Sequence, residues 1–408
     1  MQLLDPSRIW VTLLVGLGGA GLVGYLWARS LARHLRLRRE MRFGWAQVGD
    51  RLEERFTIDN RSRLPALWVE VIDHSNLPGY SASLVTGVSG ESENSWQTQG
   101  VCMRRGLFTL GPTAIQSGDP LGFFTVSVQD PASAQLMVMP PILPLPTIEV
   151  APGGRAGEGR RCTNAPEPSV SVSHPRPYQP GDSPRWIHWR TSARRAAWYV
   201  RSFDSTPVSN WWIFLDMNRS VQFGQQPTST EEHGIILAAS LADRGLRLGR
   251  AVGLVAAGKD FSWLPPREGS ERRWEILRAL ALIVPGSTSF ADVLGRVRLS
   301  LEQRATLILI TSDTKGDWLA SLLPLIWRGA TVTALLLDPP SFGGDGDSLS
   351  LASVLSKWGI SHSIITPDLL NRPEATPGRS GQWEWRIMPT GQAVPIRRPR
   401  RVDWKALA

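Results

Sequence analysis

The stretch WWIFLDMNRS, residues 211–220, joins an apolar run to a short polar segment that contains Asp216, Asn218 and Ser220. A continuous apolar run of this length is typical of a strand that is buried on both faces of a parallel sheet. Apolar runs then alternate with amphipathic segments as far as residue 367. The alternation predicts βαβ units and a mostly parallel sheet covered by helices on both faces, an α/β domain that we place at residues 208–371.

The limits of the expected elements follow from the ends of these runs. We expect strands at residues 211–216, 250–257, 306–313, 331–338 and 361–367. We expect helices at residues 230–245, 270–283, 290–303, 318–327 and 350–359.

Oxygen-bearing side chains follow the strands of this predicted sheet. Asp216 ends the first strand and is followed by Asn218 and Ser220, Thr288 lies in a loop between helices, and Asp313 ends a later strand. Ligands of open parallel sheets bind outside the carboxyl ends of the strands, and oxygen ligands suit a hard cation such as Mg²⁺. The sequence therefore predicts a metal site, while helix capping and turn formation remain the alternative explanation for the same residues.

The order of these residues resembles the metal-ion-dependent adhesion site of von Willebrand factor type A domains, whose pattern is D-x-S-x-S, then Thr, then Asp. Asn218 stands in place of the first serine. The resemblance implies a Rossmann-like, von Willebrand type A-like domain whose cation binds a carboxylate of a partner protein.

A basic and aromatic segment precedes the α/β domain. Residues 176–204 read RPYQPGDSPRWIHWRTSARRAAWYVRSFD, with six arginines and three tryptophans against two acids. The Pro-Gly-Asp sequence predicts a turn, and guanidinium groups can pair with carboxylates or stack on indoles. We interpret the segment first as a connector between domains, second as a partner-docking surface, and third as a nucleic-acid groove.

This segment resembles the signature of a bacterial family called domain of unknown function 58. The matching residues are Tyr178, Pro180, Gly181, Asp182, Arg185, Ile187, Trp189, Ser192, Ala193 and Arg194. An R-R-G and D-P-x-G-F pattern between Arg104 and Phe123 extends the resemblance. It implies a membrane anchor, a β-rich domain and a von Willebrand type A-like domain, and a MoxR-type AAA+ ATPase as partner in protein maturation or envelope stress.

Residues 9–28 form an uncharged apolar run long enough to cross a bilayer as a helix. Arginines follow it at positions 29, 33, 36, 38, 39 and 42, so the positive-inside rule predicts a single-pass protein with its bulk in the cytoplasm. The run also contains a GxGxxG pattern, but the basic stripe after it argues against a dinucleotide site. A cleaved signal peptide is disfavoured, because its positive end comes first and its apolar core is shorter.

The remaining segments complete the expected organisation. Residues 1–42 are the transmembrane anchor with its basic flank, 43–146 a small all-β, sandwich-like domain of short alternating strands, and 147–207 a linker with the signature. Residues 372–408 are expected to be an irregular basic tail.

No catalytic pattern accompanies this organisation. The chain lacks GxxxxGK[ST], HExxH and GxSxG motifs, its six histidines are scattered, and its two cysteines are far apart. We therefore expect a non-enzymatic, membrane-anchored interaction protein without an evident small-molecule substrate. The alternatives are a metal-dependent, membrane-tethered hydrolase or nuclease and, given a net charge of +9, an electrostatic binder of anionic lipid or nucleic acid, of which nucleic acid is the less expected.

Overall fold

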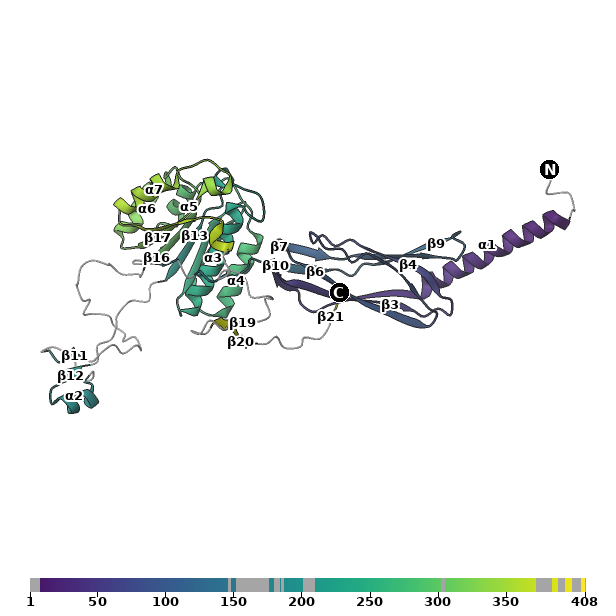
Figure 1. Ribbon diagram of the computed structural model, residues 1–408, viewed down its shortest axis with the longest axis horizontal. Coiled ribbons are helices and arrows are strands. Elements are labelled where there is room, and N and C mark those ends of the chain that lie inside the picture. The colour runs from purple at the N-terminus through teal and green to yellow at the C-terminus, as the bar shows by residue number, and fades with distance from the viewer. Residues whose placement is uncertain are drawn as a thin grey trace.

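The structure, a computed structural model, describes residues 8–145, 148–151, 176–179, 184, 187–200, 210–301, 305–371, 384–387, 393–397 and 405–407. A long N-terminal helix leads into a β-rich region, which is followed by an α/β region (Figure 1). A small unit of short elements lies beyond the α/β region, on the side away from the β-rich region (Figure 1).

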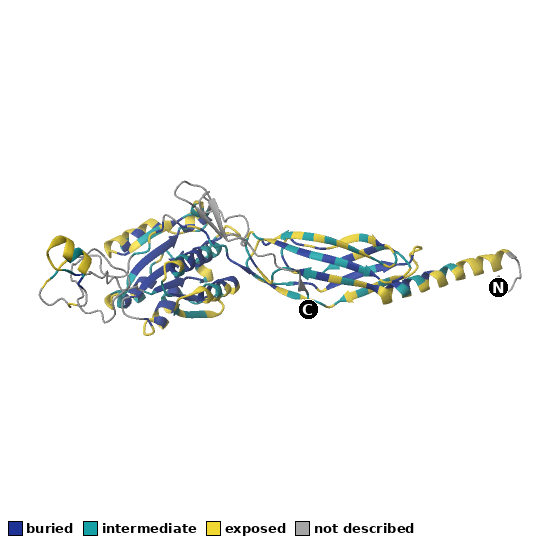
Figure 2. Cartoon of the chain, turned by 90° about the horizontal axis from the view of Figure 1, so that it is seen from below, coloured by how far each residue is buried: buried dark blue, intermediate teal, exposed yellow. Residues whose placement is uncertain are grey.

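The apolar run forms one helix, α1 (Arg8–His34). Most of its apolar side chains between Ile9 and Val23 are exposed (Figure 2). Its last turns pack on the β-rich region, where Leu31 is fully buried. The length and composition of α1 are consistent with a single-pass membrane anchor.

The β-rich region contains three sheets. Their strand orders are β21-β1-β3-β6, β2-β10-β7 and β5-β4-β8-β9. The region's own strands are β1 (Leu35–Met41), β2 (Trp45–Gln47), β3 (Arg51–Asn60), β4 (Ala66–Asp73), β5 (Leu84–Val88), β6 (Ser92–Val101), β7 (Gly106–Leu110), β8 (Thr113–Gly118), β9 (Thr125–Asp130) and β10 (Ala134–Met139). Alternate residues are buried, as the period of a strand requires (Figure 2).

The basic flank of the helix is part of the β-rich region rather than of the anchor. Strand β1 begins at Leu35, directly after α1 and inside the segment 1–42 assigned to the anchor. Arg39 in this strand is buried in ion pairs with Glu54 at 2.7 Å and Asp73 at 2.8 Å. The alternation of β1 was hidden in the sequence because a charged residue occupies a core position.

The α/β region has a six-stranded sheet with the order β15-β14-β13-β16-β17-β18. All neighbouring pairs are parallel except β14 and β15. Its strands are β13 (Trp211–Leu215), β14 (Val252–Ala257), β15 (Phe261–Arg267), β16 (Thr306–Thr311), β17 (Thr331–Leu337) and β18 (Ser361–Ile365). Its helices are α3 (Thr230–Arg247), α4 (Ser270–Leu282), α5 (Phe290–Val297), α6 (Trp318–Trp327), α7 (Ser348–Lys357) and α8 (Asp368–Asn371), with 3-10 turns η3 (Arg219–Val221) and η4 (Pro339–Phe342).

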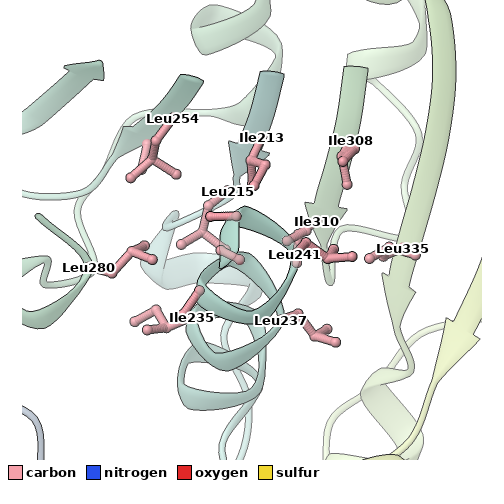
Figure 3. Packing of buried hydrophobic residues seen from close by; sticks show 14 of the residues in the cluster. Ile213, Leu215, Ile235, Leu237, Leu241, Leu254, Leu280, Ile308, Ile310 and Leu335 are labelled. Carbon is pink, nitrogen blue, oxygen red and sulfur yellow. The ribbon is translucent and has the colours of Figure 1, made fainter. Parts of the chain in front are cut away.

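Helices cover both faces of this sheet. On one face, α3 and α4 pack against side chains such as Ile213 and Leu215 (Figure 3). On the other face, α5, α6 and α7 pack against Trp212 and Phe214. Burial of alternate residues of β13 on opposite faces explains why its sequence is continuously apolar. The mostly parallel α/β fold predicted from the sequence is confirmed.

Two elements differ from the sequence prediction. Strand β15 was not expected, because it contains Pro265 and Pro266. It forms nevertheless at the antiparallel edge of the sheet, where a strand tolerates proline. Helix α5 ends at Val297 instead of continuing to residue 303.

The two remaining segments contain short strands. In the linker, β11 (Arg176–Pro177) pairs with β12 (Tyr199–Val200), and α2 (Trp189–Arg195) lies beside them. The tail 372–408, expected to be irregular, contains β19 (Glu384–Ile387), β20 (Ala393–Arg397) and β21 (Lys405–Ala406). Strand β21 pairs with β1, which brings the end of the chain back to the β-rich region. The basic composition of the tail indicated an irregular segment, but β21 forms because its backbone pairs with β1, which is distant in the sequence.

A buried arginine joins the β-rich region to the α/β region. The Arg105 guanidinium lies against Glu231, at 2.6 Å, and Glu232 in the first turn of α3, and it donates to the Ile283 carbonyl at 2.9 Å. In the sequence, Arg104, Arg105 and Gly106 stand out only as part of the pattern that extends the family resemblance. The glutamates lie more than a hundred residues away, so no local pattern indicated this contact.

Candidate functional site

The site predicted at the carboxyl edge lies where the sheet changes its direction of growth. From β13 the chain adds β14 on one side, and it later adds β16 on the other. Asp216 directly follows β13, and Asp313 lies two residues after β16. Ligands of open α/β sheets bind at such a switch point, in the crevice between the two strand ends.

Asp216 is buried, with 5% of its surface exposed. One carboxylate oxygen accepts the backbone N–H of Asn218 at 3.0 Å, and the other accepts the Thr311 hydroxyl at 2.6 Å. Burial nevertheless raises the pKa of the Asp216 carboxyl to about 6, because desolvation outweighs these two hydrogen bonds. Among the described residues, no arginine or lysine forms an ion pair with Asp216.

Asp313 follows β16, the parallel neighbour of β13, and its negative charge adds a little to the raised pKa of Asp216. The two loops are also linked through Thr311, whose hydroxyl oxygen accepts the Asp313 backbone N–H at 2.9 Å. The Asp313 carboxylate accepts the Lys315 backbone N–H at 2.8 Å. The two carboxylates therefore follow neighbouring strands at the same edge of the sheet.

Asn218 and Ser220 bond to each other. The Asn218 side-chain oxygen accepts the backbone N–H of Ser220 at 3.1 Å and its hydroxyl at 3.0 Å, and so caps η3. This is the capping role that the sequence allowed as an alternative to metal binding. To coordinate a cation, the Asn218 side-chain oxygen would have to give up at least one of its two hydrogen bonds from Ser220.

The loop that carries Thr288 lies beside the loop after β13. The Gly286 N–H donates to the Met217 carbonyl at 2.9 Å, and the Arg219 N–H donates to the Gly286 carbonyl at 2.8 Å. A Cβ on Gly286 would lie 2.1 Å from the Gly258 carbonyl oxygen, so only glycine fits here. Thr288, two residues further on and half-buried, is thus carried to the same edge of the sheet.

The donors at this edge suit a cation that keeps several waters. Among the residues that the structure describes, no three His, Cys, Asp or Glu side chains group closely enough to hold a metal ion by themselves. Two carboxylates, hydroxyls and an amide oxygen fit Mg²⁺ better than a transition metal, because Mg²⁺ prefers oxygen ligands and retains water. The residues at this edge therefore fit Mg²⁺ in the chemistry of their oxygen donors.

Sequence reasoning missed the polar residues that hold Asp216. Thr311 donates to its carboxylate, the Gln222 side-chain amide donates to its backbone carbonyl at 3.1 Å, and the Ser312 hydroxyl donates to the Val221 carbonyl. Thr311 and Ser312 directly precede Asp313 in the sequence ITSD, a cluster that pointed to this edge.

The described residues of the signature segment, 178–179, 184 and 187–194, belong to the small unit outside the two main regions (Figure 1). The Tyr178 ring contacts Trp198 edge-on, with centroids 5.7 Å apart. Ser192 accepts the Tyr199 N–H at 2.9 Å, and Ile187 is buried against Val200. These contacts explain the fixed small and aromatic positions as requirements of local folding.

The outer surface of this unit is aromatic and basic. Trp189 is 69% exposed and Trp198 is 60% exposed, and Ala193 and Arg194 are also exposed. Pro180, Gly181, Asp182 and Arg185 lie outside the described residues. His188 caps α2 by accepting the Thr191 N–H.

Comparison with known proteins finds a family that resembles this segment and the first part of the sheet. Residues 174–341 match the model of the family described as protein of unknown function DUF58. The resemblance found from Tyr178 to Arg194 is confirmed, and the matched DUF58 region continues through the α/β core to η4.

Two relatives of this region are described as uncharacterized proteins. The uncharacterized protein Rv1480 of Mycobacterium tuberculosis is 28% identical over 187 residues, which are 43% of this chain and 57% of that protein. The uncharacterized protein YeaD of Bacillus subtilis is 31% identical over 107 residues, 26% of this chain and 25% of that protein. The chain therefore spans only part of each relative.

Solved structures show distant likeness only. Proximal thread matrix protein 1 from the mussel byssus matches 40% of this chain and 44% of its own, with a TM-score of 0.31 and 17% identity. The complex of zinc 2-glycoprotein and prolactin inducible protein from human seminal plasma contains a chain that matches over 26% of this chain and 96% of its own, with a TM-score of 0.21 and 9% identity.

Proposed function

We propose that this chain is a membrane-anchored, non-enzymatic interaction protein. The carboxyl edge of its α/β sheet captures an acidic side chain of a partner protein through a divalent cation. The partner is an AAA+ ATPase of the MoxR type, acting in protein maturation or an envelope-related process.

One observation carries this proposal. Asp216 and Asp313 follow the two strands that flank the switch point of the sheet, and Asp216 is buried without an ion-pair partner among the described residues. A buried carboxylate beside a second carboxylate is unfavourable unless a positive charge compensates it. A divalent cation from solution supplies that charge, and its remaining coordination positions can accept a carboxylate from the partner.

The proposed ligands follow the resemblance to the metal-ion-dependent adhesion site of von Willebrand type A domains. Asp216 and Asp313 supply carboxylate oxygens, Ser220 and Thr288 supply hydroxyls, and Asn218 supplies an amide oxygen. The mostly parallel sheet with helices on both faces supports this assignment of the domain. Mg²⁺ is the proposed ion because it retains water where protein ligands are few.

The proposed orientation keeps the bulk of the chain in the cytoplasm. Arg39 is neutralised by Glu54 and Asp73, and Arg42 lies 3.1 Å from Glu53, so these two arginines contribute little positive potential. Arg29, Arg33, Arg36 and Arg38 are exposed directly after the apolar turns of α1. Four exposed arginines on this side, against Arg8 on the other, still favour a cytoplasmic location under the positive-inside rule.

The small unit is proposed as a second contact with the partner. Exposed indoles such as Trp189 and Trp198 are typical of interface anchors, and arginines beside them can pair with acidic groups. The unit lies beyond the α/β region and away from the β-rich region (Figure 1), which favours a docking role over a connector between those two regions.

A metal-dependent hydrolase or nuclease is the rival function, and it needs a general base near the cation. His233 packs edge-on against Phe342, and its Nδ1 lies 2.9 Å from the Ser229 carbonyl. Burial lowers the pKa of His233. A residue held in this way supports the structure of η4 and α3 rather than a reaction.

Binding of the partner tests the proposal directly. We would measure the affinity of a purified MoxR-type ATPase for the full chain in nanodiscs, without nucleotide, for the wild type, Asp216→Asn and Glu271→Gln. Glu271 is exposed in the first turn of α4, at the opposite edge of the sheet, and serves as the charge-matched control. We expect Asp216→Asn to weaken binding at least about tenfold. Equal binding by all three proteins would contradict the metal bridge, and absence of binding would contradict the partner.

A further inference from the structure

The bilayer-sized part of α1 ends where the helix meets the β-rich region. Ile9–Leu26 is apolar and about 27 Å long at the α-helical rise, close to the thickness of a bilayer core of about 30 Å. Gly24, Ala28 and Leu31 then form a buried stripe against the β-rich region. The Trp27 indole N–H donates to the Pro65 carbonyl at 3.1 Å. If α1 spans the membrane, the β-rich region therefore lies at the membrane surface without a spacer.

The turn between β8 and β9, Asp119–Phe124, lies beside this end of the span; we call it the apolar turn. Its Phe124 ring contacts Tyr25 of α1 edge-on, with centroids 5.8 Å apart. A Cβ on Gly24 would lie 3.1 Å from a carboxylate oxygen of Asp119. Gly24 thus allows the apolar turn to approach α1 closely.

The apolar turn is held rigidly by its own aspartate. Asp119 is 1% exposed, and its carboxylate accepts the backbone N–H of Leu121 at 2.9 Å and of Phe124 at 2.6 Å. Gly122 adopts a φ of 75°, a conformation that suits glycine. The backbone of the turn is therefore fixed by buried hydrogen bonds.

This rigid turn presents apolar side chains to the outside. Leu121 is 58% exposed and Phe123 is 56% exposed. Leu67, next to the Pro65–Ala66 contact with α1, is also 58% exposed. Exposed apolar groups gathered at one level beside a membrane helix are expected to lie in the interface, where their burial is favourable.

We propose that the apolar turn inserts into the headgroup boundary of the membrane that α1 spans, and so fixes the tilt of the β-rich region on the bilayer. This inference rests on the membrane anchoring in the proposed function. Lipid is the favoured occupant because the apolar surface of the turn continues that of α1. Arg29, which lies beside Tyr25 through a hydrogen bond of 2.8 Å, and exposed Arg33 extend this side of α1 with charges that complement anionic headgroups.

The test is the depth of a spin label on the full chain in nanodiscs of phosphatidylglycerol and phosphatidylethanolamine. Labels are placed at Leu121→Cys, at Leu17→Cys in α1 and at Met103→Cys, in a Cys162→Ser background. Met103 is a matched control because it is apolar and 64% exposed, and it lies close in sequence to Arg105, which contacts α3. Oxygen and a water-soluble nickel chelate report contact with lipid and with water respectively.

We expect the label at position 17 to report the bilayer centre, the label at 121 the headgroup level, and the label at 103 bulk water. Nickel accessibility at 121 should be about threefold or more below that at 103. Water accessibility at 121 equal to that at 103, with 17 still in lipid, would overturn the insertion alone. A water-exposed label at 17 would overturn the anchor itself.

Shielding of the label at 121 from both oxygen and nickel would mean that protein covers the turn, which also overturns insertion into lipid. A second variant, Leu121→Ser with Phe123→Ser, keeps the buried Asp119 hydrogen bonds. It should let a label at Leu67→Cys rise toward water, by a similar factor in nickel accessibility. No change at position 67 would contradict a role of the turn in fixing the tilt.

Discussion

Arg39, in strand β1 of the β-rich region, and Asp216, directly after strand β13 of the α/β region, are both buried charged residues, but their surroundings differ. Arg39 pairs with Glu54 and Asp73 and donates to the Ser75 hydroxyl at 3.0 Å. Asp216 accepts only neutral donors and lies near a second carboxylate. A compensated charge specifies packing, whereas an uncompensated charge at a switch point is available to a ligand.

The largest effect is expected from removing the compensated charge. Arg39→Met leaves Glu54 and Asp73 buried together, and loss of one partner of a buried ion pair costs about 3–5 kcal/mol. We predict this loss in the stability of β1, β3 and β4, measured by hydrogen exchange of the full chain. Arg38→Met is the matched control, because Arg38 is exposed on the same strand. A loss below about 1 kcal/mol, as at an exposed site, would mean that the network contributes little.

Asp216→Asn tests the uncompensated charge through pH. The pKa of Asp216 rises from its ordinary 3.8 to about 6 in the folded protein, so the folded state holds this proton more tightly than the unfolded chain. Its protonation stabilises the fold below pH of about 4, and this contribution is lost as pH rises to about 6. The wild type should therefore lose about 3 kcal/mol relative to Asp216→Asn between about pH 3 and about pH 7, in metal-free buffer. Parallel pH profiles of the two proteins would contradict the raised pKa.

Arg105 sharpens the comparison, because it is a compensated charge between two regions. Glu231 and Glu232 are 17% and 14% exposed, so they regain some hydration when Arg105 is removed. We predict that Arg105→Ala costs about 2 kcal/mol, less than Arg39→Met, and increases hydrogen exchange in the first turn of α3. Arg104→Ala, at an exposed neighbour, should leave exchange there unchanged.

The smallest effect on stability is expected from Asn218→Ser. Serine caps a 3-10 turn about as well as asparagine, so unfolding free energy should change by less than about 0.5 kcal/mol. The substitution also replaces the Asn218 amide oxygen, which is occupied by two hydrogen bonds from Ser220, with a hydroxyl oxygen. We predict a severalfold tighter Mg²⁺ affinity by calorimetry. Weaker affinity would identify the Asn218 amide as a required ligand.

The sequence predicted the parallel sheet because β13, β16 and β17 are mostly apolar, and it identified the carboxyl edge because Asp216 and Asp313 lie at the ends of strands. It did not predict the beginning of β1, where Arg39 occupies a core position. It did not predict the contact of Arg105, whose glutamates are distant in sequence. Charges that are compensated by tertiary partners have no local pattern, whereas strand ends do.

The measurement that tests the central claim most directly is calorimetric titration of Mg²⁺ into the full chain in nanodiscs at pH 7.5, where Asp216 is ionised. We predict saturable binding to the wild type and to Glu271→Gln, and its loss in Asp216→Asn. Absence of heat in the wild type, or equal binding by Asp216→Asn, would contradict a cation site at the switch point of the sheet.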